Sequence, residues 1–322
     1  MRKKRHTSRR TWAWGLVAGA AVDRVVADPQ RGHPVALFGT AAARLERLLY
    51  APSRVRGALF AAAALAPVAA LGAFADTRTG RWRALAVTAA TWTVVGGAML
   101  EREAAALADA LHSGDLAEAR RRLPHLCGRD PRGLDEQALA RATIESVAEN
   151  TSDAVVAPLV WGALLGCTGL LTYRAVNTLD AMVGHRSTRY ARFGWAAARL
   201  DDMANWAPSR LTALLAVAAA PLIGGDPRRA WRSWIRDGQR HPSPNAGQCE
   251  AAFAGALGVR LGGRNIYDGR VEERPQLGDG PPPAAADIHR AIRLSRAVTV
   301  GAVLLTAAAA WGLAVGDRRG RR

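Results

Sequence analysis

Lysine is almost absent from this 322-residue chain, which contains only Lys3 and Lys4. Their place at the N-terminus excludes a P-loop lysine and a Schiff-base lysine in the body of the protein. Any phosphate must therefore be bound by arginine, by helix N-termini or through a metal ion.

Cysteine is also scarce. The three cysteines are Cys127, Cys167 and Cys249, with no CxxC pair among them, and this excludes a disulfide framework and a cysteine-rich zinc site. We expect buried or incidental thiols. No internal repeat is visible, and the spacing of Gly258, Gly262 and Gly263 matches no nucleotide-binding fingerprint.

The formal charge of +17 and the pI of about 11.3 raise the question of nucleic-acid binding. However, the arginines are spread through nearly every connection, and no strip of aromatic and basic residues accompanies them. The ends MRKKRHTSRR and DRRGRR instead fit cytoplasmic tails that obey the positive-inside rule. We therefore expect no nucleic-acid partner.

Apolar residues are concentrated in six stretches, although the mean hydropathy of −0.04 alone would suggest a soluble protein. Several stretches approach the ~20 residues that cross a bilayer. They predict an all-α, polytopic protein of the cytoplasmic membrane, in contact with the lipid bilayer, and a strand pattern is visible only around Arg264–Val271. The stretches are Trp12–Ala27, Gly57–Ala75, Ala84–Leu100, Ala154–Leu171, Leu211–Gly225 and Ala297–Gly316.

We expect a single membrane domain over residues 1–322. Within it we place basic tails at 1–10 and 317–322, a polar helical segment at 101–153 and a long polar connection at 226–296.

Acids and amides occur at helical spacing beside these apolar stretches. Glu145, Glu149 and Asp153 are spaced i, i+4, i+8, so three like charges share one helix face next to an apolar run. Such an arrangement is costly unless a metal or cationic ligand matches it. The other clusters contain Asn177 with Asp180, and Asp201 and Asp202 with Asn205.

The segment HPSPNAG, residues 241–247, predicts a rigid loop followed by a helix. Asn245 can cap a helix that begins near Gln248, and Gly247 permits close approach to the backbone. A helix N-terminus with free amides suits a phosphate. For Pro242 and Pro244 a purely structural, rigid turn is a serious alternative, whereas Ser243 and Asn245 are the better functional candidates.

Four segments together resemble the family of membrane-bound adenosylcobinamide-phosphate synthases of cobalamin biosynthesis, called CbiB or CobD. They are DRVVADPQRGHPVALFGTAAARLE, ATIESVAENTSDAVVAPLVWGALLG, YRAVNTLDAMVGHRSTRYARFGWAAARLDDMANWAPSRLT and HPSPNAGQCEAAFAGALGVRLGG. The order and spacing of the segments carry the resemblance, which extends from about Asp23 to Leu277. Within the first segment, Asp28-Pro29 and His33-Pro34 each predict a turn.

The resemblance implies a ligation that requires ATP and Mg²⁺. The carboxylate of adenosylcobyric acid would be joined to the amine of (R)-1-amino-2-propanol O-2-phosphate, or to the free amino alcohol. A carboxylate must first be activated, for example as an acyl phosphate, which calls for Mg²⁺ and oxygen ligands. The implied partners are the corrinoid, the amino-alcohol phosphate and other membrane enzymes of cobalamin assembly.

Set beside that reaction, the polar residues fall into three groups. The candidates for catalysis are Glu145, Glu149, Asp202 and His241; for substrate or phosphate binding they are Asn150, Asn177, Asp180, Arg199, Asn205, Ser243, Asn245 and Gly247; for metal binding they are Asp153, Asp201 and Asp202. Arg199 is alternatively an ion-pair partner of Asp201 and Asp202. Arg186, Arg189 and Arg192 either anchor the chain at the membrane surface or bind phosphate.

A membrane transporter or sensor with buried acids is the competing function. The lack of internal repetition and the length of the polar motifs argue against it.

Overall fold

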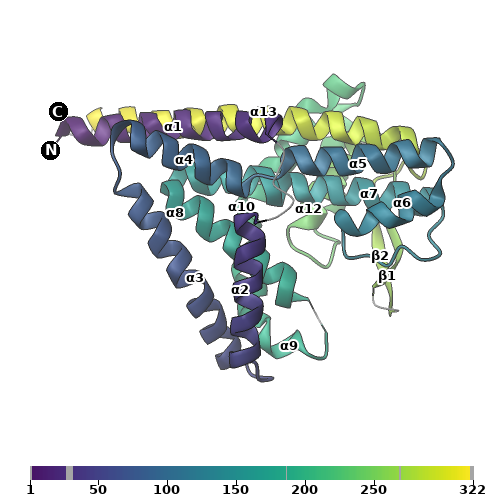
Figure 1. The fold of residues 1–322 in the computed structure, drawn as a ribbon. Coiled ribbons are helices and arrows are strands. Elements are labelled where there is room, and N and C mark those ends of the chain that lie inside the picture. The colour runs from purple at the N-terminus through teal and green to yellow at the C-terminus, as the bar shows by residue number, and fades with distance from the viewer. Residues whose placement is uncertain (1, 27–31, 186, 268–269, 320–322) are drawn as a thin grey trace. The chain divides into compact units, whose positions relative to one another are not determined.

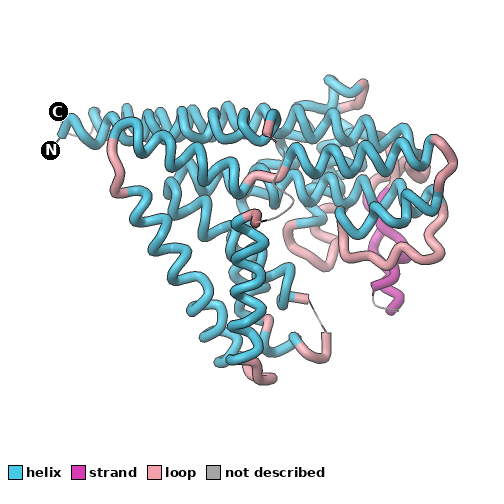
Figure 2. Tube along the Cα trace, in the orientation of Figure 1, coloured by secondary structure: helices cyan, strands magenta, loops and turns pink. Residues whose placement is uncertain are grey.

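The regular secondary structure of the described residues is helical apart from one hairpin, as the sequence predicts (Figure 2). The computed structural model describes residues 2–26, 32–185, 187–267 and 270–319, so Asp28-Pro29 and Arg186 lie outside the described residues. The longer helices are α1 (Arg2–Val25), α2 (Pro34–Leu49), α3 (Arg54–Asp76), α4 (Gly80–Val94), α5 (Gly97–His112), α7 (Glu136–Thr151), α8 (Ala157–Leu179), α10 (Trp195–Ala219), α11 (Pro227–Asp237), α12 (Ala246–Leu257) and α13 (Ala285–Arg319). The shorter elements are α6 (Leu116–Arg122), η1 (Leu123–His125), η2 (Ser152–Val156), η3 (Asp180–Gly184), α9 (Tyr190–Phe193) and η4 (Ala220–Ile223).

Among the described residues, five helical stretches have the length and apolar composition needed to cross a membrane, which identifies a polytopic membrane protein. They overlap five of the six predicted stretches. The sixth, Trp12–Ala27, is not among them; its described part lies largely in α1, where Asp23 and Arg24 interrupt the apolar run. The five are Arg54–Asp76, Gly80–His112, Glu136–Gly184, Trp195–Ile223 and Ala285–Gly312.

The chain forms two compact units. Unit 1 contains residues 1–96, 157–205 and 302–322, and unit 2 contains residues 97–156 and 206–301. The chain passes repeatedly from one unit to the other, so no single linker marks a boundary in the sequence. The single domain expected over 1–322 stays a prediction.

In unit 1, small residues allow helices to pack closely. α1 packs on α4 (Figure 1), and a side chain on Gly15 or Gly19 would collide with Val87 or Thr91 of α4. α3 packs on α8, where Gly72 faces the backbone of Thr168. Helices in membranes associate mainly through such close contacts of small residues, because lipid offers no hydrophobic driving force.

A break divides α8 at Gly166, whose φ of 64° and ψ of −141° are not helical. The break exposes backbone N–H groups that need a partner. Asp76, the last residue of α3, accepts hydrogen bonds from the backbone N–H groups of Cys167 (2.9 Å) and Thr168 (3.0 Å) and from the hydroxyl of Thr168 (2.8 Å). Asp76 therefore caps the second part of α8.

In unit 2, α12 is the innermost element, because all of its residues are buried. α11 and α7 pack against it, and so does the antiparallel hairpin of β1 (Leu261–Tyr267) and β2 (Arg270–Leu277). The strand pattern around Arg264–Val271 is thus confirmed. The pairing of Leu261 with Leu277 and of Gly263 with Arg274 leaves an irregularity between Leu261 and Gly263.

Candidate functional site

The predicted site residues form two polar clusters, one in each unit. The cluster of unit 1 joins α8 and α10. Asp201, which is 9% exposed, accepts a hydrogen bond on each carboxylate oxygen, from the side-chain amides of Asn177 (3.2 Å) and Asn205 (3.0 Å). The hydroxyl of Tyr173 donates to Asn205 Oδ1 (2.8 Å), and Arg174 donates to Asn177 Oδ1 (3.3 Å). Asp201 and Asn205, which lie at positions i and i+4 on one face of α10, are thus hydrogen-bonded to each other.

The other predicted residues of unit 1 lie around this network. Asp202 points to a different side of α10, is partly exposed, and forms an ion pair with Arg199 at 3.8 Å. That ion pair is the alternative that the sequence left open for Arg199. Asp180 begins the π-helical turn η3, and a side chain at Gly184 would collide with its carboxylate. Single π-helical turns inside helices are frequent at functional sites.

The cluster of unit 2 begins with a buried ion pair. Glu145 of α7 accepts from Arg129 Nη2 at 2.6 Å, and both side chains are less than 5% exposed. Its other oxygen accepts from the backbone N–H of Gly262 in β1 at 2.7 Å. Both oxygens of Glu145 are thus engaged in fixing the hairpin and the loop of Arg129 to α7, which suits a positioning residue.

Glu250 lies next to this ion pair, although no sequence pattern singled it out. It is 1% exposed, and its Oε1 is 3.8 Å from Nε2 of His241, which is 3.1 Å from Nη1 of Arg274 in β2. Burial, together with the charges of Glu145 and Glu149, raises the pKa of Glu250 well above its ordinary value. The neutral acid is therefore favoured.

His241 faces hydrogen-bond donors at both ring nitrogens. The backbone N–H of Ser243 donates to Nδ1 (3.0 Å), and Arg274 lies against Nε2. Burial, then the charge of Arg274, lowers the pKa of His241 to about 4. The imidazole is consequently neutral at pH 7, and because Nδ1 accepts from Ser243, its one N–H group is at Nε2, on the side of Arg274 and Glu250.

Glu149, Asn150 and Asp153 follow Glu145 along the same stretch. Asn150 donates to the backbone carbonyl (2.9 Å) and hydroxyl (3.0 Å) of Ser146, and Asp153 lies in the π-helical turn η2. Burial, then the charge of Asp153, raises the pKa of the Cys249 thiol, and Glu149 adds to the effect. The acids of α7 and η2 therefore act electrostatically on α12. The thiol itself is buried and free, as expected.

The loop before α12 corrects one prediction. The helix begins at Ala246, two residues before the expected Gln248, and the side chain of Asn245 makes no capping hydrogen bond. The hydroxyl of Ser243 instead accepts from the backbone N–H groups of Asn245 (3.3 Å) and Ala246 (3.2 Å). Asn245 Oδ1 accepts from the Ser209 hydroxyl (3.2 Å), a partner on α10 that local spacing does not reveal.

Gly247 is required for packing. A Cβ atom at this position would collide with His241 and with the backbone carbonyl of Gly238. The close approach predicted at Gly247 is thus made by the protein's own loop. This packing holds His241 against the start of α12.

Metal ligands are not gathered into a preformed cage. Within residues 2–26, 32–185, 187–267 and 270–319, no three His, Cys, Asp or Glu side chains are placed to hold one ion. Mg²⁺ is usually held by one or two carboxylates together with the phosphates of a substrate, so binding it does not require such a cage. The metal roles of Asp153, Asp201 and Asp202 stay predictions.

Three functional candidates escaped the sequence analysis: Arg129, Glu250 and Arg274. Glu250 is the single charged residue of α12, in an otherwise small and apolar helix. An isolated charge in such a helix is a detectable signal, because burying it requires partners. Arg129 and Arg274 had no such signal, because arginines are common in nearly every connection of the chain.

Comparison with known proteins identifies a class and then a family. Residues 16–295 match the family described as "CobD/Cbib protein". A "Cobalamin biosynthesis protein CobD" of Mycobacterium tuberculosis is 53% identical over 299 residues, which cover 92% of this chain and 96% of the relative. Proteins of the same name from Chromobacterium violaceum and Geobacter metallireducens are 45% and 44% identical, covering 89% and 91% of this chain and 94% and 95% of the relatives.

The chain is therefore a membrane protein of a biosynthetic pathway. It belongs to the CobD/CbiB family. This membership supports a role in cobalamin biosynthesis. No solved structure gives a significant match.

Proposed function

We propose that the chain is an acid–amine ligase that makes adenosylcobinamide phosphate. It would join the carboxylate of adenosylcobyric acid to the amine of (R)-1-amino-2-propanol O-2-phosphate, with ATP as the energy source. The unphosphorylated aminopropanol is the alternative acceptor and would give adenosylcobinamide. We place the reaction at the cytoplasmic membrane, where the ligase would work beside other membrane enzymes of cobalamin assembly.

The observation that carries the proposal is the buried charged cluster of unit 2. Glu145, Glu250, Arg129 and Arg274 are brought together from α7, α12, a loop and β2, and both acids are almost fully buried. Burying ions costs several kcal/mol each, so a cluster of this kind is weak evidence for stability and favours a functional site. The cluster includes acids from two of the segments that resemble the synthases.

The chemistry consists of two balanced steps. A carboxylate oxygen of the corrinoid attacks the γ-phosphorus of ATP, which gives an acyl phosphate and ADP. The amine nitrogen then attacks the acyl carbon, the C–O bond to phosphate breaks, and an amide, inorganic phosphate and one proton result. Mg²⁺ bound with ATP would neutralise charge on the phosphoryl oxygens.

The amine reaches the active site as an ammonium ion, so a group of the protein must accept a proton. Glu250 suits this role in its ionised form, which the charges of Arg274 and Arg129 favour against burial, because a carboxylate with a raised pKa is a stronger base than an ordinary one. His241 lies between Glu250 and Arg274 and would position the carboxylate. Arg129 and Arg274 place positive charge beside the acids, where a corrinoid carboxylate would also be attracted.

The test is a reconstitution in detergent. Purified protein, adenosylcobyric acid, aminopropanol phosphate and MgATP should together give a corrinoid whose mass matches the amide, and omission of any one component should abolish the product. Condensation that proceeds without ATP would overturn the ligase. Parallel reactions with free aminopropanol identify the preferred acceptor. A transporter, the competing function, would show no corrinoid product with either amine.

A further inference from the structure

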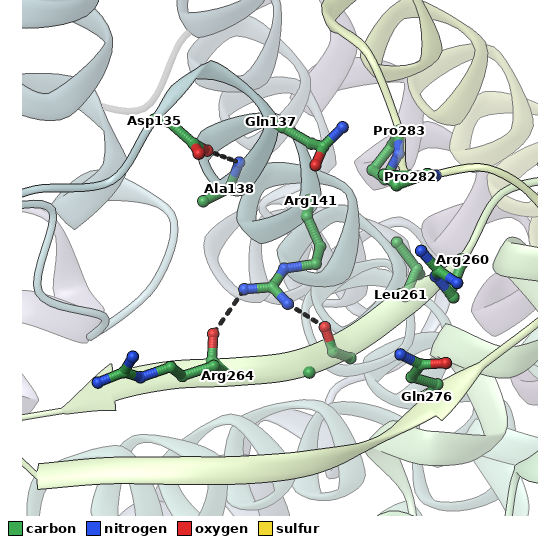
Figure 3. Close-up of a pocket in the computed structure, with 12 residues that line it drawn as sticks. Asp135, Gln137, Ala138, Arg141, Arg260, Leu261, Arg264, Gln276, Pro282 and Pro283 are labelled. Carbon is green, nitrogen blue, oxygen red and sulfur yellow. Dashed lines mark hydrogen bonds between the residues drawn. The ribbon is translucent and has the colours of Figure 1, made fainter.

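A second polar feature of unit 2 lies outside the charged cluster. It is a cavity of about 240 Å³ between the first turns of α7, the start of the hairpin and the prolines that precede α13 (Figure 3). Its polar side chains are Asp135, Gln137, Arg141, Arg260, Arg264 and Gln276. We call it the arginine pocket.

Arg141 forms a fixed positive wall of this pocket. Its guanidinium donates to the backbone carbonyls of Gly262 and of Arg264 (2.7 Å for the latter), as the dashed lines in Figure 3 show. Glu145, one turn further along α7, accepts from the N–H of the same Gly262. The C=O and N–H groups of Gly262 are thus both hydrogen-bonded to side chains of α7. Gly262 therefore links Arg141 of the pocket to Glu145 of the charged cluster.

Arg260 and Arg264 flank Arg141. Figure 3 shows Arg260 on the side of Pro282 and Arg264 along β1. Both residues are exposed, and within the described part of the chain neither guanidinium makes a hydrogen bond or ion pair. These long, exposed side chains can turn toward a ligand without breaking a hydrogen bond or an ion pair.

The charge of the pocket is unbalanced. Against three arginines stands Asp135, and its carboxylate accepts from the backbone N–H of Ala138 (2.8 Å) as the cap of α7. Gln137 and Gln276 add amide donors to the lining. Planar guanidinium groups bind phosphate oxygens through paired hydrogen bonds, and this chain has no lysine after Lys4 to do so.

We propose that the arginine pocket binds the phosphate group of a phosphorylated substrate. The inference rests on the proposed function, which supplies two sources of that group, the amino-alcohol phosphate and ATP. Because Gly262 both lines the pocket and bonds to Glu145, a phosphate held there brings the rest of its molecule to the edge of the charged cluster.

The experiment uses the full chain in detergent and two binding probes, inorganic phosphate and tripolyphosphate. Arg260→Gln with Arg264→Gln should weaken binding by about tenfold for each arginine that contacts phosphate. The matched control is Arg228→Gln with Arg232→Gln, which removes the same charge from exposed positions of α11 and should keep the affinity of the parent. Equal thermal melting of all three proteins confirms that they are folded.

The two sources are separated by kinetics. If the pocket takes the amino-alcohol phosphate, the double variant raises KM for that substrate and leaves KM for ATP unchanged; the reverse pattern assigns ATP. If the Arg260→Gln, Arg264→Gln variant binds both probes as the parent does, or if the control loses as much affinity, the pocket does not bind phosphate. This conclusion holds even if the protein makes the amide. Probe binding that depends on Arg260 and Arg264 in a protein that makes no amide supports the pocket and overturns the proposed function.

Discussion

Asp201 in unit 1 and Glu250 in unit 2 are both buried carboxylates, but their surroundings differ. Asp201 is surrounded by neutral donors, the amides of Asn177 and Asn205, which satisfy both of its oxygens. Glu250 lies among charges of both signs and beside the imidazole of His241. Amide donors stabilise the ionised form of a carboxylate. A cluster of charges of both signs instead leaves its protonation sensitive to a charged ligand.

The difference separates two roles that the sequence could not distinguish. A carboxylate saturated with amide hydrogen bonds connects α8 to α10 and fixes their spacing. A carboxylate among charges of both signs can gain or lose a proton when a charged substrate arrives. The following experiments test whether this division of roles is correct.

Glu250→Gln should produce the largest effect. Glutamine keeps the shape of the neutral acid but cannot accept a proton, so amide formation should fall by about 10²–10⁴-fold, the usual contribution of a general base. Because the raised pKa of Glu250 already favours its neutral form, the variant should melt at the same temperature as the parent. The rate is measured with saturating MgATP and both substrates. Near-normal turnover would remove Glu250 from catalysis and leave the cluster without a proton acceptor.

Glu145→Gln should instead act on stability. It leaves the buried guanidinium of Arg129 without its counter-charge, which costs about 3–5 kcal/mol of unfolding free energy. Adding Arg129→Met should restore part of the loss, because it removes the buried charge that Glu145→Gln leaves without a partner. Glu118→Gln, which breaks ion pairs of the more exposed Glu118, serves as the control and should cost at most about 1 kcal/mol. A single variant as stable as the parent would show that this ion pair is dispensable.

The helices and the local pairs within them could be predicted because their signals repeat over a few residues. The apolar stretches overlap the five helical stretches that can span a membrane, and the i, i+4 spacing of Asp201 and Asn205 predicts that they share one helix face, where they are hydrogen-bonded. Contacts between distant segments could not be predicted in this way. Glu145 and Gly262 are far apart along the chain, and only the folded hairpin brings them together.

Two further features depended on tertiary context. The cap of α12 was assigned to Asn245 by residue type, but Ser209 engages that side chain and leaves the cap to Ser243. Asp76 carried no signal at the end of an apolar helix, because the break in α8 that it caps arises at a glycine inside another apolar run. In both cases a partner from another element decided the role of the side chain.

Asp201→Asn should have a smaller effect than the loss of the buried ion pair. An asparagine presents one oxygen and one N–H₂ group, so either Asn177 or Asn205 would face another donor, at a cost of about 1–3 kcal/mol. Thermal melting should show the loss, while KM for MgATP stays near that of the parent. If melting is unchanged and turnover instead needs much higher Mg²⁺, the metal role predicted for Asp201 is correct and the comparison with Glu250 fails.

Ser243→Ala should have the smallest effect and the most local one. Its hydroxyl accepts from the N–H groups of Asn245 and Ala246, so its removal should cost about 1 kcal/mol at the start of α12, roughly a fivefold faster hydrogen exchange of these two amides. Ser243→Thr keeps the hydroxyl and should exchange as the parent does. Asn245→Ala should leave the amide of Ala246 protected, since its side chain bonds to Ser209 and not to the helix start. Faster exchange at Ala246 in Asn245→Ala than in Ser243→Ala would return the capping role to Asn245.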